Sequence, residues 1–251
     1  MKSKLVISVI IAALGLIIAT WVFGVSLKNR NEKQNTISVT GLGTKQFTSD
    51  LITWSGKFST TGINLKEVYD ALANDKSVIY NYLISKGVKP EEIVFSAVDI
   101  EKEYDYETNS DGSSRRVFTG YELTQSVSIE SQEVSKIENL SRDITEIINQ
   151  GIEFTSSSPK YFYTKLAEVK QDMIANATKD AKERAEKIAN NAGSKLGKLK
   201  KASMGVIQIT APNSDEDFSY GGTFNTASKE KEASITIRLE YNVLLIIVFD
   251  W

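Results

Sequence analysis

The longest amphipathic pattern in this chain runs from Leu166 to Gly197 and predicts a helix with one alanine-rich face. Apolar residues recur there at spacings of three, four and seven, which places them on one side of an α-helix. The stripe consists of Leu166, Met173, Ala177, Ala181, Ala185, Ile188, Ala192 and Leu196. Because most of these residues are alanine, we expect the surface that packs against them to come close. Gly193 stands where a left-handed cap would end the helix.

Upstream of this helix, strand and helix periodicities alternate in an order typical of an α+β fold. Helices are expected over 64–84 and 134–148, ended by Gly87 and Gly151. Strands are expected over 51–60, 93–100 with a possible run to Tyr104, 117–129 and 152–155. This β-α-β-β-α-β order predicts a ferredoxin-like unit with an antiparallel sheet. The polar segment 105–116, with Asp111-Gly112 at its centre, is typical of the turn of a long hairpin.

The remaining elements lie before and after this unit. A strand starts at Ile37, and Gly41 and Gly43 interrupt it, as glycines do at a bulge or at a close backbone approach. The long helix is expected from Tyr161 to Ala192. The strands 199–209 and 233–241 should then form a C-terminal β-hairpin across a polar loop, 212–230, whose composition predicts mobility.

The first thirty residues contain a segment long enough to cross a membrane. Leu5 to Leu27 is free of charge, with Lys2 and Lys4 before it and Lys28 after it. About 20 apolar residues span a bilayer, so this run favours an uncleaved anchor. A cleaved signal peptide is the alternative, although its apolar core is usually shorter. Either way, residues 1–30 predict that the following domain is exported.

A second apolar run closes the chain. Val243 to Phe249 reads VLLIIVF and is far too short for a helical span. We expect it to continue the preceding strand or to lie in an interface between subunits, because an exposed run of this kind promotes aggregation. Residues 243–251 are therefore treated as an apolar C-terminal extension.

Composition removes several classes of chemistry. The chain contains no histidine and no cysteine, which excludes Cys/His zinc sites, Ser-His-Asp and Cys-His nucleophiles, haem attachment and disulfides. Its net charge of −2 offers no basic excess to neutralise nucleic-acid phosphates. No phosphate-binding glycine loop precedes a helix. The sequence thus nominates no catalytic residue, no cofactor-binding residue and no metal ligand.

Two clusters of side chains offer alternatives to a chain without binding residues. Glu101, Glu103, Asp105 and Glu107 could bind a hard cation through oxygen, although a solvated hairpin tip explains them as well. Aromatic residues could serve a binding module for a protein or ligand, although packing in a core or sheet also accounts for most of them. They are Tyr104, Tyr106, Tyr121, Tyr161, Phe162 and Tyr163.

Three segments together resemble the SIMPL-domain family of bacterial envelope proteins, a domain of unknown function. They are ISVTGLG at Ile37 to Gly43, DAKERAEKIANNAGSKLGKL at Asp180 to Leu199, and ASITIRL at Ala233 to Leu239. The resemblance covers about residues 36–242. It implies an exported α/β domain, in a family whose members include ring-forming assemblies, surface antigens and proteins linked to oxidative-stress tolerance. It supplies no catalytic residues to carry over.

These observations favour a non-enzymatic, exported envelope protein that is structural or self-assembling, periplasmic and either anchored by residues 5–27 or released after cleavage. We expect a homo-oligomer, contact with the membrane through that segment, and no nucleic-acid partner. A binding module for an envelope protein or ligand is the alternative, and a carboxylate-based metal enzyme is a weaker one.

Overall fold

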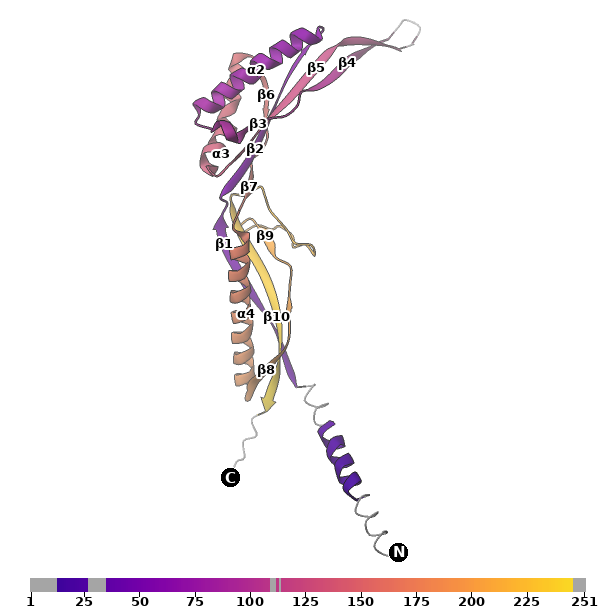
Figure 1. Cartoon of the computed structure of the whole chain (residues 1–251), viewed down its shortest axis with the longest axis vertical. Helices are drawn as coiled ribbons and strands as arrows, with labels where there is room; N and C mark the ends of the chain where they lie inside the picture. Colours follow the sequence, from indigo (N-terminus) through magenta and orange to yellow (C-terminus); the bar gives the residue numbers. More distant parts are fainter. Residues whose placement is uncertain (1–12, 27–34, 109–111, 113, 246–251) are drawn as a thin grey trace, which may run out of the picture.

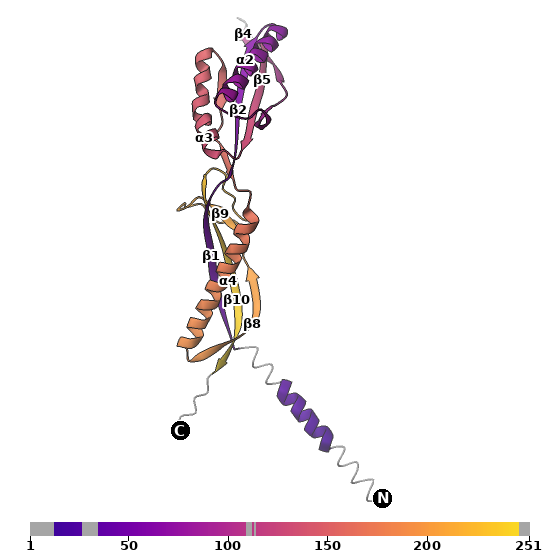
Figure 2. The same cartoon turned by 60° about the vertical axis from the view of Figure 1, so that its left-hand side comes forward.

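The computed structural model describes residues 13–26, 35–108, 112 and 114–245. It shows an elongated α+β molecule in which two lobes lie end to end (Figure 1). In the part described there are four helices and two antiparallel sheets. Figure 2 shows the same stacking from a second direction, so the length of the molecule is not an effect of the view.

The basal lobe, residues 36–48 and 166–245, is built from both ends of the chain. Its sheet has the strand order β1-β10-β8, and β9 also pairs with β10. The strands are β1 (Thr36–Thr48), β8 (Ser194–Met204), β9 (Gln208–Thr210) and β10 (Glu230–Leu245). The expected C-terminal hairpin is present as β8 and β10, but the strand predicted over 199–209 is two strands, β8 starting at Ser194 and β9 at Gln208. β10 also pairs with the whole length of β1, from Thr36 opposite Asn242 to Thr48 opposite Glu230.

One long helix, α4 (Leu166–Asn191), covers one face of this sheet. The alanine stripe packs as expected: Ala177, Ala181 and Ala185 are fully buried. The strand opposite comes so close that a Cβ on Gly41 would lie 2.2 Å from the Ala177 carbonyl oxygen. The predicted close approach at Gly41 and Gly43 is therefore confirmed, and glycine is needed there because the helix backbone occupies the space of a side chain.

Part of the predicted stripe was wrong. Ile188 is 52% exposed and Ala192 is also exposed, whereas Val169 and Ala189 are buried. The buried residues recur strictly every four positions, along the ridge that is inclined to the helix axis. The helix also starts later than expected, because Tyr161 belongs to the short strand β7 (Lys160–Phe162). Gly193 does adopt the predicted left-handed conformation, with φ of 68°.

The apical lobe, residues 51–162, is inserted between β1 and α4. Its sheet has the order β3-β5-β2-β6, with β4 on β5 and β7 on β2. The strands are β2 (Leu51–Gly62), β3 (Ile93–Phe95), β4 (Asp99–Thr108), β5 (Ser114–Ser131) and β6 (Glu153–Ser156). Helices α2 (Leu65–Ser85) and α3 (Val134–Asp143), with the 3-10 turns η1 (Pro90–Glu92) and η2 (Ile144–Gln150), complete it. Gly87 follows α2 with positive φ, as Gly151 follows η2. The single helix predicted over 134–148 is α3 continued by the 3-10 turn η2.

The apical core is made of large side chains. Trp54, Phe58, Leu72, Ile79 and Ile137 are among its buried members, and they join one face of the sheet to α2 and α3. The opposite face of β2 carries small polar residues such as Thr53, Ser55 and Ser59. This sheet is thus covered on one side and polar on the other, which is the usual arrangement for an antiparallel sheet with one wet face.

The predicted single strand over 93–104 is two strands. β3 and β4 both pair with β5, but the chain breaks register between them, where Ser96 turns aside. The Ser96 carbonyl oxygen accepts from the Gln125 side chain at 2.7 Å, and the Ser96 amide donates to the Ser126 carbonyl at 2.9 Å. Beyond this break, β4 and the first part of β5 leave the lobe as a projecting two-stranded ribbon (Figure 1).

The two apolar terminal runs are described only in part. Residues 13–26 form a helix, and residues 5–12 and 27 of the expected anchor lie outside the described residues. Within the described residues, no helix combines the length and hydropathy that crossing a membrane requires. At the other end β10 continues to Leu245, with Val243 opposite Leu196, so the predicted strand continuation is confirmed as far as the structure describes it.

Candidate functional site

The ribbon of β4 and the facing part of β5, residues 99–108 and 114–124, is called the arm. All ten residues of β4 are exposed. A register shift between Glu103 and Tyr104 is absorbed by β5, so β4 keeps a strict alternation of side chains. The two faces of the arm can therefore be assigned residue by residue.

One face of the arm is aromatic and cationic. It carries Tyr104 opposite Phe118 and Lys102 opposite Tyr121. The ring centroids of Tyr104 and Phe118 lie 5.8 Å apart, and those of Phe118 and Tyr121 lie 5.1 Å apart. The Arg116 guanidinium lies 3.6 Å from the Tyr104 ring centroid, a cation–π contact. Among the described residues of the arm, no carboxylate lies on this face.

The other face holds the acidic residues. Asp99 and the four residues weighed above as a cation site, Glu101, Glu103, Asp105 and Glu107, alternate along β4 on this side. Glu107 pairs with Arg115 across the ribbon at 3.2 Å. In the part of the chain that the structure describes, no group of three or more acidic residues is placed to hold a metal ion.

A hollow adjoins the aromatic face where the arm meets the first turn of α2. It is called the apical hollow, measures about 440 Å³ and is lined by Leu65, Lys66, Tyr69 and Ile100. Tyr69 is 52% exposed and Ile100 50% exposed. Asn64 caps this helix end, because its side chain accepts from the Lys66 amide at 3.0 Å. The apical hollow thus lies beside a capped helix end and next to the aromatic face of the arm.

A second unusual feature is the loop after β9, which displays two aromatic side chains. In the knob, defined as residues 215–220, Phe218 is 71% exposed and Tyr220 is fully exposed. The loop predicted to be mobile is hydrogen-bonded to β9 at Ser219 and Thr223. The buried Gln208 amide donates to the Ser219 carbonyl at 2.8 Å and accepts from the Thr223 amide at 2.7 Å.

The end of the same loop is held by a buried lysine. Lys231 is 0% exposed, and its ammonium donates to the Asn225 and Ser228 carbonyl oxygens. Burial lowers the pKa of Lys231 below its usual range, and the charge of Glu216 opposes that shift only in part. The fold therefore uses two buried polar side chains to fix a loop whose aromatic residues point into solvent.

The knob overhangs a cavity on the outer face of the basal sheet. This basal hollow measures about 530 Å³, and its lining includes Phe218, Tyr220, Leu42, Val206 and Ile235. Its walls are mainly apolar, and the Gln208 amide at its edge is already occupied by the loop. The cavity suits an apolar or aromatic group more than a charged one.

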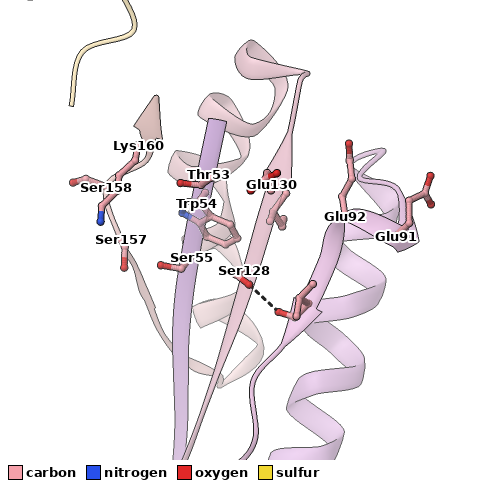
Figure 3. A pocket seen from close by; sticks show the side chains of 12 residues that line it. Thr53, Trp54, Ser55, Glu91, Glu92, Ser128, Glu130, Ser157, Ser158 and Lys160 are labelled. Carbon is pink, nitrogen blue, oxygen red and sulfur yellow. Dashed lines mark hydrogen bonds between the residues drawn. The ribbon is translucent and has the colours of Figure 1, made fainter. Parts of the chain in front are cut away.

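A groove of about 670 Å³ lies on the polar face of the apical sheet (Figure 3). Thr53, Ser55 and Ser128 present hydroxyls there, and Glu91, Glu92 and Glu130 lie at one end (Figure 3). Ser128 donates to the Val94 carbonyl at 3.3 Å, and Glu92 accepts from Ser131 at 2.8 Å. These groups can hydrogen-bond a polar ligand, and the two bonds of Ser128 and Glu92 given above tie them to the protein itself.

The aromatic residues singled out from the sequence separate into two groups. Tyr104 and Tyr106 are exposed on the arm, with Tyr121 at its base. Tyr161 is buried in the apical core, Phe162 stacks on Phe224, and Tyr163 lies on Phe47. Phe218 and Tyr220 were missed, although three aromatic residues in the polar loop, with Phe224, were a visible signal.

Comparison with known proteins gives one positive result. The profile of the family described as "SIMPL: Protein of unknown function (DUF541)" matches residues 37–243. A search of curated proteins finds no match.

Proposed function

This chain belongs to the SIMPL family, whose description assigns no molecular role, and from that premise we propose that it is a non-enzymatic, exported envelope protein that assembles with copies of itself. The observation that carries the proposal is the separation of chemistry between the two faces of the arm. The contacts among Tyr104, Phe118 and Arg116 stabilise the ribbon itself, but they do not require that every carboxylate of the arm lie on the other face. Such a division is expected where one face meets a partner.

Two further features support assembly. An isolated two-stranded ribbon is marginally stable, and the arm projects beyond the lobe with Tyr106 67% exposed. The knob presents its own exposed aromatics on a loop that is already ordered by Gln208. Surfaces that are ordered before binding lose less conformational entropy on association.

The test is the mass of the full chain in solution. Purified in a mild detergent and measured by sedimentation velocity at about 10 µM, it should sediment as an oligomer larger than a dimer. A monomer at every concentration would overturn the proposal of self-assembly.

The proposed location rests on residues 5–27, which carry no charge and precede the domain. Protease added to spheroplasts should digest the chain beyond residue 30 while residues 1–30 stay with the membrane. Resistance until the spheroplasts are lysed would place the domain in the cytoplasm. The mass of the mature N-terminus separates a retained anchor from a cleaved signal.

We also propose that the apical lobe is a ferredoxin-like unit. The strand order β3-β5-β2-β6, in which β6 lies next to β2 and all pairs are antiparallel, supports this assignment. The helices α2 and α3 pack on the same face, as the split β-α-β arrangement requires.

A binding module is the second candidate, and the basal hollow favours it. A mainly apolar cavity with two aromatic side chains at its rim could hold an apolar side chain of another envelope protein. Affinity capture from envelope extract with the wild type and with Val206→Asp compares the two readings. A stoichiometric foreign protein, lost from the variant, would favour the binding module.

A further inference from the structure

We propose that the knob of one copy inserts between the arm and α2 of a neighbouring copy, with Phe218 and Tyr220 against the apical hollow. The inference rests on the proposed self-assembly and names the two surfaces that would make it. It follows from three independent properties of these surfaces: their exposure, their charge and their position in the molecule.

Exposure is the first property. Tyr220 is fully exposed and Phe218 is 71% exposed, yet the loop that carries them is fixed at Ser219 and Thr223 by a buried side chain. On the receiving side, Tyr69 and Ile100 are half exposed around a hollow of about 440 Å³. A cavity of that size can accept an aromatic ring, and burying such rings supplies much of the affinity at protein interfaces.

Charge is the second property. The knob contains Asp215, Glu216 and Asp217 and no basic residue. The receiving face carries Lys102 and Arg116 on the arm, while the acidic residues of the arm are turned to its opposite face. Lys66 at the hollow is already paired with Asp70 at 2.8 Å, so the positive charge comes from the arm. An acidic, aromatic knob therefore meets a cationic, aromatic surface, which favours this pairing over the acidic face of the arm.

Position is the third property. The loop after β9 lies near the middle of the molecule, whereas α2 and β4, whose residues line the hollow, lie in the apical lobe (Figure 1). A chain held in this elongated form cannot bring its own knob to its own hollow. The contact must be between copies, and because two different surfaces meet, it is heterologous. Each copy can then bind one neighbour through its knob and another through its hollow, which yields a ring or a filament.

The natural absence of cysteine makes a direct test possible. Two full-length variants, Tyr220→Cys and Ile100→Cys, are each exposed at the changed position, so each should melt like the wild type. Mixed, allowed to exchange subunits and mildly oxidised, they should form a disulfide-linked dimer containing one chain of each kind. Each variant alone should form at least about tenfold less dimer.

A matched control places the thiol on the acidic face of the same strand. Glu103→Cys is exposed like Ile100→Cys, but it points to the opposite side of the arm. Mixed with Tyr220→Cys, it should give little dimer. Preferential linking of Tyr220→Cys to Glu103→Cys, or to itself, would overturn the inference, and so would the lack of any mixed dimer.

Charge exchange gives a second, independent measurement. The variant Lys102→Glu/Arg116→Glu should dissociate at a concentration at least about tenfold higher than the wild type, as close charge pairs do when one partner is reversed. Adding Asp215→Lys/Asp217→Lys to the same chain should restore association. Loss without restoration would show that the arm binds something other than the knob.

The two levels of the proposal fail in different ways. If the wild type is an oligomer, but Phe218→Ala and Lys102→Glu leave its mass unchanged and the thiol pairs give no mixed dimer, the interface is elsewhere and self-assembly stands. If the wild type is a monomer, self-assembly and this interface both fall. Ile188→Ala, an exposed apolar change on the outer side of α4, serves as the control that should leave the mass unchanged.

Discussion

In both lobes helices pack on one face of a sheet, but the side chains at the contact are large in the apical lobe and small in the basal lobe. In the apical lobe, α2 and α3 stand off from the sheet on large residues such as Phe58, Leu72 and Ile79. In the basal lobe, α4 lies almost on the strand backbone, with alanine against glycine. The contact between the helices and the sheet of the apical lobe involves large apolar side chains, whereas in the basal lobe the backbones of α4 and β1 lie close together. The apical lobe should therefore be most sensitive to truncation and the basal lobe to enlargement.

The largest expected effect is the removal of an apical core ring. Phe58 is 1% exposed and packs edge-on against Phe95, with ring centroids 6.2 Å apart. Phe58→Ala should lower the free energy of unfolding by about 3–5 kcal/mol, through lost burial and the cavity left behind. Denaturant unfolding followed by Trp54 fluorescence, with Trp21 and Trp251 changed to Phe, would report it. The neighbouring exposed residue supplies the control, Lys57→Ala, which should change little.

Enlarging the basal contact should come next. Ala185→Leu places three further carbons where α4 meets the sheet, and overpacking of this kind typically costs about 1–3 kcal/mol. Glu186→Leu, one position along and half exposed, should have a much smaller effect. Equal melting temperatures for the two variants would contradict the assignment of the buried face. An enlargement tolerated at Ala185 would also remove the contrast between the lobes.

The junction of the lobes should respond less. The Asp50 carboxylate accepts from the Thr164 amide and from the Thr164 hydroxyl, both at 2.7 Å. Asp50→Ala should lower the free energy of unfolding by about 1.5 kcal/mol, because bonds to a charged acceptor are among the stronger ones. Scanning calorimetry should show the transition broadening as the lobes lose this connection. Asp215→Ala, on the exposed loop, should leave its width unchanged.

The smallest effect at neutral pH, and the most specific, concerns Lys231. Burial lowers the pKa of Lys231 in the folded chain, so between that pKa and the ordinary value of 10.5 the unfolded chain binds more protons. The free energy of unfolding should therefore gain a contribution that grows as the pH rises through this window. Comparing Lys231→Met with wild type from about pH 7 to 10 should reveal that contribution as a widening difference in favour of the wild type.

The control for this titration is an exposed lysine on α4, and Lys187→Met should follow the wild type at every pH. If the difference in the free energy of unfolding between wild type and Lys231→Met does not change with pH, the Lys231 ammonium is not desolvated in the folded chain.

Local pattern alone was sufficient for the type and order of most elements, but only for some of their ends. Helix periodicity located α2, α3 and α4, and glycine's freedom at positive φ identified the ends at Gly87, Gly151 and Gly193. The alanine stripe of α4 and the two glycines of β1 predicted a close approach of backbones, because small side chains can be recognised in the sequence without knowing which element packs on them. The sequence alone also excluded chemistry that needs histidine or cysteine, because it contains neither residue.

Only the tertiary structure decided which elements meet. β1 pairs with β10, about 200 residues away, and nothing in either strand specifies that partner. The burial of Val169 and Ala189 in place of Ile188 follows from the angle at which α4 crosses the sheet, since an inclined helix buries a ridge of every fourth residue rather than a straight stripe. The loop after β9 looked mobile because its own composition is polar. It is hydrogen-bonded by Gln208 and Lys231, which flank the loop, and their bonds to Thr223 and Ser228 form only when the loop folds back on β9 and β10. Periodicity depends on residues that are close in the sequence. The pairing of strands, the way a helix packs on a sheet and the anchoring of a loop depend on contacts that exist only in the folded chain.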